Sequence, residues 1–309
     1  MKKIKVFAPA SVSNVGPGFD MMGFALHKPG DEVELKLNTA KEIRITKISG
    51  DGGMLPLDPK KNTTTGAIIS LLNKYNINIG LDVSINKKMG IGSGLGSSAA
   101  SAVAGVFAVN KLLNLKLSKH DLLEHAIAGE FIASGSIHAD NVAPALFGGF
   151  VLIRSYNPID IIQLDYPQNL FCSVVYPEIV IKTIEARKIL DKTFELKAGI
   201  AQAGNAAGLV AGLLTKDISL IGRSIVDQFA EQKRSTLIPC YDEIRVAAIS
   251  AGAINCNISG SGPSMFAFST SQKIAEKVAL EMKKAAKKKG FGSKIYVSKI
   301  NEKGPAVLK

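Results

Sequence analysis

The sequence has little cysteine and no long uninterrupted apolar segment. Its three cysteines (Cys172, Cys240 and Cys256) are far apart and lack a histidine cluster, which excludes a disulfide framework or zinc site and predicts free thiols. The longest apolar run, 142–153, is interrupted by Pro144 and two glycines and cannot span a bilayer. The lysine-containing N-terminus lacks the apolar stretch of a signal peptide. We therefore expect a cytoplasmic protein without a membrane partner.

Several common functional motifs are absent as well. No Gly-x-Ser-x-Gly or His-Glu-x-x-His sequence occurs, so serine hydrolase and metalloprotease activities have no support. His120 and His125 lie in a predicted polar helix, and we expect both at the surface. The net charge of +12 favours anionic ligands. The lysine-rich stretch 283–294 contains only one aromatic residue, which indicates a solvated helix end rather than a nucleic-acid site.

What the sequence does have is a glycine-rich segment at 89–98, Met-Gly-Ile-Gly-Ser-Gly-Leu-Gly-Ser-Ser. Glycine is conformationally costly, so four in seven positions indicate a loop whose amides approach a ligand closely. A helix is predicted immediately after it, over 97–113, with Ser97 or Ser98 as the N-cap. Exposed amides at a helix N-terminus bind anions. A flexible linker is the weaker alternative, because a strand precedes the segment and a helix follows it.

The spacing of these glycines excludes two common phosphate loops. No lysine follows them at the position that a Walker A motif requires. A dinucleotide fingerprint also fails, because the sixth position counted from Gly90 or Gly92 is not glycine. No acidic residue occurs between Asp82 and Asp121 to bind a ribose. We therefore predict a phosphate loop of a third type.

Two segments carry polar residues that suit a substrate or a metal. Asn14 and Asp20 flank a Gly-Pro-Gly turn and could bind ammonium and hydroxyl groups, although an Asx-stabilised turn alone would explain Asn14. Glu130 lies in a helix of small and apolar residues. If its carboxylate faces inward it suits Mg²⁺, and if not it is a surface glutamate. His138, Asp140 and Asn141 follow it. His138 could equally be a core or capping histidine, and Asp140 or Asn141 could be a helix cap.

A fourth segment, 258–268, contains Ser-Gly-Ser-Gly-Pro-Ser between two apolar stretches. It is either a plain hairpin turn or a second wall against the phosphate loop. Along the whole chain, strands and helices alternate irregularly, which predicts an α+β protein. Residues 1–48 are predicted to form strands, with clear alternation at 32–37 and 43–48. Further strands are predicted at 81–86, 149–155, 161–164, 171–176, 253–258, 264–269 and 294–298. The predicted helices are 63–75, 97–113, 118–133, a short one over 138–146, several within 182–252, and 271–289.

Taken together and in this order, the four segments resemble the GHMP family of small-molecule kinases. The similar motifs are Ala-Pro-Ala-x-x-x-Asn-x-Gly-Pro-Gly-Phe-Asp, Gly-Ser-Gly-Leu-Gly-Ser-Ser-Ala-Ala, Ser-Gly-Ser-Ile-His-Ala-Asp-Asn-Val-Ala-Pro and Ile-Ser-Gly-Ser-Gly-Pro-Ser. The first and third are most similar to the branch that phosphorylates L-homoserine. The resemblance covers essentially the whole chain. It implies an N-terminal α+β domain with a left-handed crossover over 1–165 and a ferredoxin-like C-terminal domain over 166–309.

The resemblance also implies roles for individual residues. The loop would hold the ATP phosphates, Asn62 would lie near the adenine, and Ser98 and Glu130 would hold Mg²⁺. The implied ATP-binding residues are Asn62, Lys87, Gly90, Ile91, Gly92, Ser93, Gly94, Leu95, Gly96, Ser97 and Ser98. The implied substrate-binding residues are Asn14, Asp20, His138, Asn141, Thr183, Arg187 and Arg234. The implied catalytic residues are Glu130, Asn141, Arg187 and Arg234.

These roles are chemically consistent with an amino-acid substrate. Two guanidinium groups suit a carboxylate, and Asp20 suits an ammonium group. Relatives usually carry proline where Gly90 stands, and several place an aspartate base where Asn141 stands. The resemblance therefore implies catalysis by alignment and charge neutralisation, with the hydroxyl proton lost late, without a dedicated base.

The remaining expectations concern partners and alternatives. The resemblance implies a homodimer, and we expect no nucleic-acid partner. One alternative is a related kinase that acts on another small alcohol. The other is a non-catalytic nucleotide or RNA binder built on the same scaffold.

Overall fold

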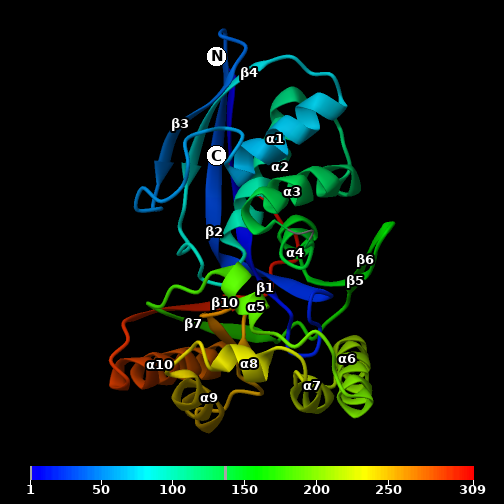
Figure 1. Ribbon diagram of the computed structural model, residues 1–309, viewed down its shortest axis with the longest axis vertical. Coiled ribbons are helices and arrows are strands. Elements are labelled where there is room, and N and C mark those ends of the chain that lie inside the picture. The colour runs from blue at the N-terminus through cyan, green and yellow to red at the C-terminus, as the bar shows by residue number, and fades with distance from the viewer. Residues whose placement is uncertain (1, 136–137) are drawn as a thin grey trace.

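The computed structural model describes residues 2–135 and 138–309, and contains two β-sheets with helices against both (Figure 1). The first sheet consists of β1 (Lys3–Ser13), β2 (Met22–Asn38), β3 (Ile43–Ser49), β4 (Gly80–Asn86), β5 (Phe150–Tyr156), β6 (Ile159–Leu164) and β11 (Ala306–Leu308). Its main order is β11-β1-β2-β4-β3, and β5 pairs with both β2 and β6. β3 and β4 run parallel, whereas the other pairs are antiparallel.

The second sheet consists of β7 (Phe171–Pro177), β8 (Asn257–Ile258), β9 (Met265–Ser269) and β10 (Ser293–Lys299). Its order is β10-β7-β9-β8, and every neighbouring pair is antiparallel. Numbered within this half of the chain, the order is fourth, first, third, second, which is the ferredoxin-like arrangement. The α+β fold class is therefore confirmed.

Helices cover both sheets. They are α1 (Thr63–Lys74), α2 (Ser97–Leu113), α3 (Lys119–Ser134), α4 (Val142–Phe147), α5 (Thr183–Lys188), α6 (Leu196–Thr215), α7 (Ile218–Ser224), α8 (Glu231–Ser235), α9 (Tyr241–Ser250) and α10 (Gln272–Lys288). α1 to α4 lie beside the first sheet, and α8 to α10 lie with the second (Figure 1). α6 and α7 pack on each other, and α6 also contacts β6 of the first sheet. The chain passes through α1 between the parallel strands β3 and β4, which is the expected crossover; its left-handedness stays a prediction.

One aromatic cluster links the two sheets. Phe24 on β2 contacts Phe266 and Phe268 on β9, and Phe150 on β5 contacts Phe268, with ring centroids 5.1–6.0 Å apart. All four side chains are fully buried, so they contribute large apolar area and specific ring packing to a shared core. β11 also returns to the first sheet beside β1. The boundary between 165 and 166 stays a prediction.

Several local predictions were wrong at their ends. The strand expected over 253–258 contains only Asn257–Ile258, and the helix expected from His138 begins at Val142. The Ser-Gly-Ser turn expected before that helix includes Ser136, which lies outside the described residues. β11 was not predicted.

Two predictions about side chains were also wrong, because tertiary partners compete with local ones. The N-cap of α2 is Gly96 in the left-handed conformation, with no side-chain cap, because the hydroxyls of Ser97 and Ser98 bond to buried carboxylates instead. His125 is buried, and its Nδ1 lies 2.8 Å from Ser70 Oγ, whereas His120 is exposed as expected. Burial lowers the pKa of His125.

α6 is one of the helices predicted within 182–252, although its apolar character was not foreseen. By length and composition alone it could cross a membrane, and it is the one such helix in the described parts of the chain. Its Gln202 is nevertheless buried: the amide nitrogen donates to Pro17 O at 2.8 Å, and the amide oxygen accepts from Gln228 N at 2.7 Å. α6 therefore supports the Gly-Pro-Gly turn that leads to Asp20.

Candidate active site

The end of β1 joins the segments that the sequence analysis singled out. Ser11 donates its backbone N–H to Leu95 O at 3.1 Å and its hydroxyl to Asn141 Oδ1 at 2.9 Å. Asn141 Nδ2 donates to Ser13 Oγ at 2.9 Å, and Gly260 N donates to Ser13 O at 3.1 Å. The glycine loop, the start of α4 and the Gly-Ser-Gly turn therefore meet at one strand end.

The glycine loop connects β4 to α2, and its glycines are required by the surrounding protein. Gly92, Gly94 and Gly96 have φ between +64° and +77°, a region that favours glycine. A Cβ at Gly94 would lie 2.5 Å from Ser259 O, and one at Gly96 would lie 2.7 Å from Asn141 Oδ1. Side chains at these positions would push the loop away from its neighbours.

The turn after β8 packs against the glycine loop. Of the two interpretations of segment 258–268, the second wall is therefore confirmed. Ser259 Oγ donates to Gly94 O at 2.6 Å, and Ser264 N donates to Ser93 O at 3.1 Å. These bonds hold loop carbonyls toward the protein. Among the described residues, the Ser93 amide is the one amide of 90–98 that donates to another backbone group. The other amides are available for an anion at the N-terminus of α2.

Glu130 on α3 reaches the same end of α2, and its carboxyl group is turned inward. Ser98 Oγ donates to Glu130 Oε1 at 2.9 Å. Burial raises the pKa of Glu130 to about 7. A hydroxyl and a carboxylate oxygen are hard ligands, and they fit a Mg²⁺ ion that takes its remaining ligands from phosphates and water. In the described ranges no three His, Cys, Asp or Glu side chains gather around a possible metal position.

Two of the expected ATP-binding side chains are engaged inside the protein. Asn62 is buried and caps α1, accepting from Thr64 N at 3.0 Å and donating to Pro56 O at 3.3 Å. Lys87 is buried in an ion pair with Asp31. Neither side chain is exposed at a surface, so their predicted contacts with ATP stay predictions.

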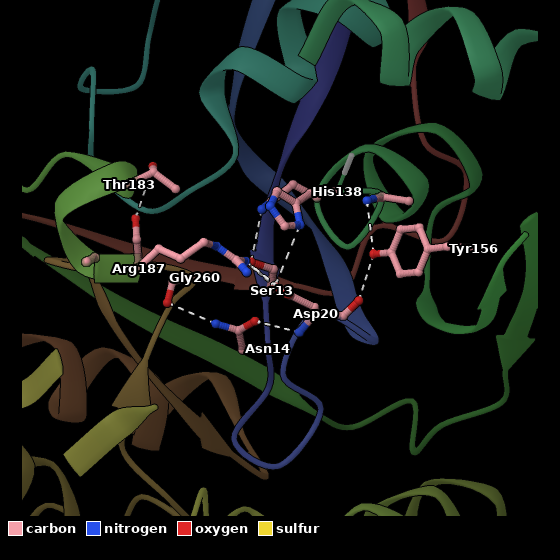
Figure 2. A network of polar contacts seen from close by, with 12 residues as sticks. Ser13, Asn14, Asp20, His138, Tyr156, Thr183, Arg187 and Gly260 are labelled. Atoms are coloured by element: carbon pink, nitrogen blue, oxygen red, sulfur yellow. Dashed lines mark hydrogen bonds and ion pairs between the residues drawn. The ribbon is translucent and has the colours of Figure 1, made fainter. Parts of the chain in front are cut away.

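Asp20 is the centre of the polar network in Figure 2. Arg187 on α5 donates Nη2 to both Asp20 carboxylate oxygens, at 2.8 and 2.9 Å. His138 Nδ1 lies 3.8 Å from Asp20 Oδ1. Burial lowers the pKa of His138. The negative charge of Asp20 raises this pKa, whereas the positive charges of Arg187 and Arg234 lower it. The balance of these effects favours the neutral form of the imidazole.

Arg234 approaches the network from α8. It is buried and donates to Gly260 O at 2.8 Å and Ala186 O at 3.2 Å. The guanidinium carbons of Arg187 and Arg234 lie 5.5 and 5.1 Å from the centroid of the Phe19 ring. Two guanidinium groups therefore lie against one aromatic ring, an arrangement that no sequence pattern predicted.

Asn14 and Thr183 complete the predicted substrate set. Asn14 Oδ1 accepts from Asp20 N at 3.1 Å, and its Nδ2 donates to Gly260 O at 3.0 Å. The Asn14 amide therefore closes the Gly-Pro-Gly turn, as expected for the alternative of an Asx-stabilised turn. Thr183 begins α5 and is exposed, with its Oγ1 3.5 Å from Ser261 Oγ.

Tyr156 is a site residue that no sequence pattern predicted. Its hydroxyl donates to Asp20 O at 2.7 Å and accepts from Ala139 N at 3.3 Å (Figure 2). Tyr156 thus ties the Asp20 loop to the segment that carries His138. Its role depends on the β5–β6 hairpin folding back to the first sheet, which no local pattern around the residue indicates.

Asp140 is a second buried carboxyl group in this region. Burial, and to a lesser extent the charge of Asp20, raises its pKa from an ordinary 3.8 to about 7. An acid whose pKa is raised by folding contributes stability that is complete below its unfolded pKa and is lost as the pH rises through the folded pKa. We therefore expect Asp140→Asn to increase Tm at pH 8 and to leave it unchanged at pH 4.

The measurement is thermal unfolding followed by circular dichroism at both pH values. Each kcal/mol gained at pH 8 corresponds to roughly 2–4 °C in Tm. Asp160→Asn, at an exposed ion pair with Arg154, is the control. An equal change at pH 4 and pH 8 would contradict a titration of Asp140.

Comparison with known proteins gives one consistent family. The model described as "GHMP kinases N terminal domain" matches residues 62–149, and the model described as "GHMP kinases C terminal" matches residues 209–288. The chain is 45% identical to a homoserine kinase of Chlorobium phaeobacteroides (strain BS1) and 47% identical to one of Chlorobium phaeovibrioides, each over 100% of both chains.

Solved structures agree with these relatives. The crystal structure of homoserine kinase from Cytophaga hutchinsonii matches with a TM-score of 0.97 and 52% identity, covering 100% of this chain and 98% of that one. L. major mevalonate kinase in complex with R-mevalonate matches with a TM-score of 0.75 over 96% of each chain. At 17% identity, the second likeness concerns the fold alone.

Proposed function

This chain belongs to the GHMP kinase family, and we propose that it transfers the γ-phosphoryl group of ATP to the side-chain hydroxyl of L-homoserine. The product is O-phospho-L-homoserine, which is used for threonine synthesis. The observation that carries the choice of acceptor is the Asp20–Arg187 ion pair, with Nη2 2.8 Å from Oδ1. Relatives named homoserine kinase, matched over the full chain, support the same acceptor.

The ion pair suits a zwitterionic amino acid. In the free protein, Arg187 and Asp20 neutralise each other. We propose that the substrate ammonium binds Asp20 while its carboxylate binds Arg187 and Arg234, so one ion pair is exchanged for two. Bidentate binding of a carboxylate is what a guanidinium group favours. A neutral sugar or a hydroxy acid without an ammonium group cannot make both contacts.

The other substrate would lie on the glycine loop. The loop amides and the N-terminus of α2 would bind the ATP phosphates, with Asn62 nearer the adenine. Ser98 and Glu130 would hold Mg²⁺, which supplies charge neutralisation to the β- and γ-phosphate oxygens when bound. Gly96 lies directly against Asn141, so the phosphate loop and the acceptor residues are adjacent.

No side chain needs to act as a base in this mechanism. Asn141 replaces the aspartate of other family members, and an amide cannot take up the hydroxyl proton. Both ends of its amide are held by Ser11 and Ser13, which fixes its position. A loose phosphoryl-transfer transition state requires little activation of the nucleophile, so the proton leaves late, to the transferred phosphoryl group. Alignment of the two substrates is then the main contribution.

The test is an ADP-release assay with L-homoserine, mevalonate, galactose and shikimate as acceptors. We expect turnover with L-homoserine and none above background with the other three. Turnover with another acceptor alone would identify a different kinase of this family. ATP binding without ADP release from any acceptor would favour a non-catalytic nucleotide binder.

We further propose that the protein acts in the cytoplasm as a homodimer, as its family resemblance implies. Analytical ultracentrifugation at micromolar concentration should give twice the mass of the 32.7 kDa chain. A sedimenting species of one chain mass would contradict the dimer and leave the proposed reaction unaffected.

A further inference from the structure

Asp31 on β2 is a fully buried carboxylate that lies next to the phosphate loop. Its Oδ1 accepts from the backbone N–H of Lys88 at 2.8 Å and of Met89 at 3.4 Å. Its Oδ2 accepts from Ser97 Oγ at 2.8 Å, from Ser101 Oγ at 3.1 Å and from the Lys87 ammonium. Five donors on one carboxylate satisfy its lone pairs and compensate its burial.

Lys87 is held as completely as its partner. Its side chain is 3% exposed, and an ammonium group has three protons to donate. Their acceptors are Asp31 Oδ2, Ser97 O at 2.8 Å and Ser101 Oγ at 2.7 Å. A direct bond to an ATP phosphate would require Lys87 to give up one of these acceptors.

The residues bound by this pair lie on both sides of the glycine loop. Residues 87–89 precede the loop, and Ser97 and Ser101 begin the helix that follows it. Asp31 therefore connects the two ends of the loop through the interior of the protein. The glycines between these ends have wide conformational freedom and give the loop little stiffness of their own.

We propose that the buried Asp31–Lys87 pair is a positioning device for the phosphate loop, and that Lys87 acts through the loop rather than on ATP. This inference rests on the proposed phosphotransferase activity for its kinetic consequences only. A buried ion pair is on average no better for stability than an apolar pair of similar size. Holding the amides in register is a role that an apolar pair could not perform, because it could not bond to the N–H of Lys88 or the hydroxyl of Ser97.

The kinetic test compares Asp31→Asn, Lys87→Met and the double variant with the wild type. We expect each single change to lower kcat/KM for ATP by about 100-fold, because a misplaced loop costs that much even when the change is remote from the chemistry. The KM for L-homoserine should stay the same. The double variant should be no worse than the worse single variant, since each single change leaves one charge buried without its partner.

A direct contact between Lys87 and ATP predicts a different outcome. In that case the losses of the two single variants would multiply in the double variant. This result, or an unchanged kcat/KM for ATP in Asp31→Asn, would overturn the proposal. Ser101→Ala, which removes one hydroxyl from the cluster and keeps the charges, should show a smaller loss of the same kind.

Hydrogen exchange gives a readout that needs no turnover. In Asp31→Asn and Ser101→Ala, the amides of 90–97 should exchange faster, whereas those of β7 and β9 should not change. Asp82→Asn, which removes a carboxylate from the neighbouring strand β4 at an exposed pair with Arg44, is the matched control and should leave the loop unchanged. If exchange became faster by the same factor across the whole protein, the variants would have lost stability in general, and this result would contradict a positioning role. If the wild-type protein does not phosphorylate L-homoserine, the proposed function is contradicted. The exchange experiment would still test the positioning role of Asp31 and Lys87, because it needs no turnover.

Discussion

Glu130→Gln is expected to lower kcat by a factor on the order of 10²–10³, the range found when one group that stabilises transition-state charge is removed. Glutamine preserves the shape of the side chain and can still accept from the Ser98 hydroxyl. It lacks the negative charge that would hold Mg²⁺ beside the phosphates. The measurement is steady-state turnover of L-homoserine at saturating ATP over a range of magnesium concentrations.

Asp140→Asn is the matched control for this change. Asp140 and Glu130 are both buried carboxyl groups whose pKa burial raises to about 7. We expect Asp140→Asn to retain most of the wild-type kcat, because Asp140 has no part in the proposed transfer. A loss as large as that of Glu130→Gln would identify Asp140 as a base and contradict the base-free mechanism.

Arg187→Met is expected to reduce kcat/KM for L-homoserine by about 100-fold, since two hydrogen bonds to a charged group contribute about 1.5 kcal/mol each. The KM for ATP should not change. Arg187 is partly exposed, so methionine can occupy its place without leaving a buried cavity. The control is Arg154→Met, which removes an exposed arginine of the β5–β6 hairpin paired with Asp160.

Two simpler alcohols show which group of the substrate Arg187 binds. The compound 3-amino-1-propanol lacks the carboxylate of homoserine, and 4-hydroxybutanoate lacks the ammonium group. Wild-type protein and Arg187→Met should turn over 3-amino-1-propanol equally slowly, because neither can use a carboxylate contact. A further loss with this compound in Arg187→Met would show that Arg187 acts in some other way, for example by holding Asp20.

Local patterns predicted much of the fold because they depend on neighbouring residues. The apolar small-residue run at 97–113 predicted α2 with the bounds that the structure has, and the alternation at 43–48 predicted β3. Glycine spacing predicted a loop before a helix N-terminus. Its positive φ angles show why glycine is required there.

Predictions failed where a distant partner decides the outcome. Ser97 has a good N-cap sequence, yet its hydroxyl bonds to Asp31, which is 66 residues away. His125 lies in a polar stretch, yet its ring is buried against Ser70. Tyr156 lies in no motif, and Phe19, although it is part of the first motif, was given no role by the sequence. Both join the site because β5 and the Gly-Pro-Gly turn fold onto it.

The sequence by itself determined that this protein is an α+β protein with a glycine loop before a helix N-terminus, since residue spacing sets both helix and strand periodicity and the loop conformation. Its motifs also indicated the family and the residues of the site. Only the tertiary structure decided which side chains face one another. Asp20 and Arg187 are 167 residues apart, and Asp31 reaches Lys87 across 56 residues. The fold brings the members of each pair together, and burial of Asp31 and Lys87 also removes water as a competing partner. No local pattern can encode that choice.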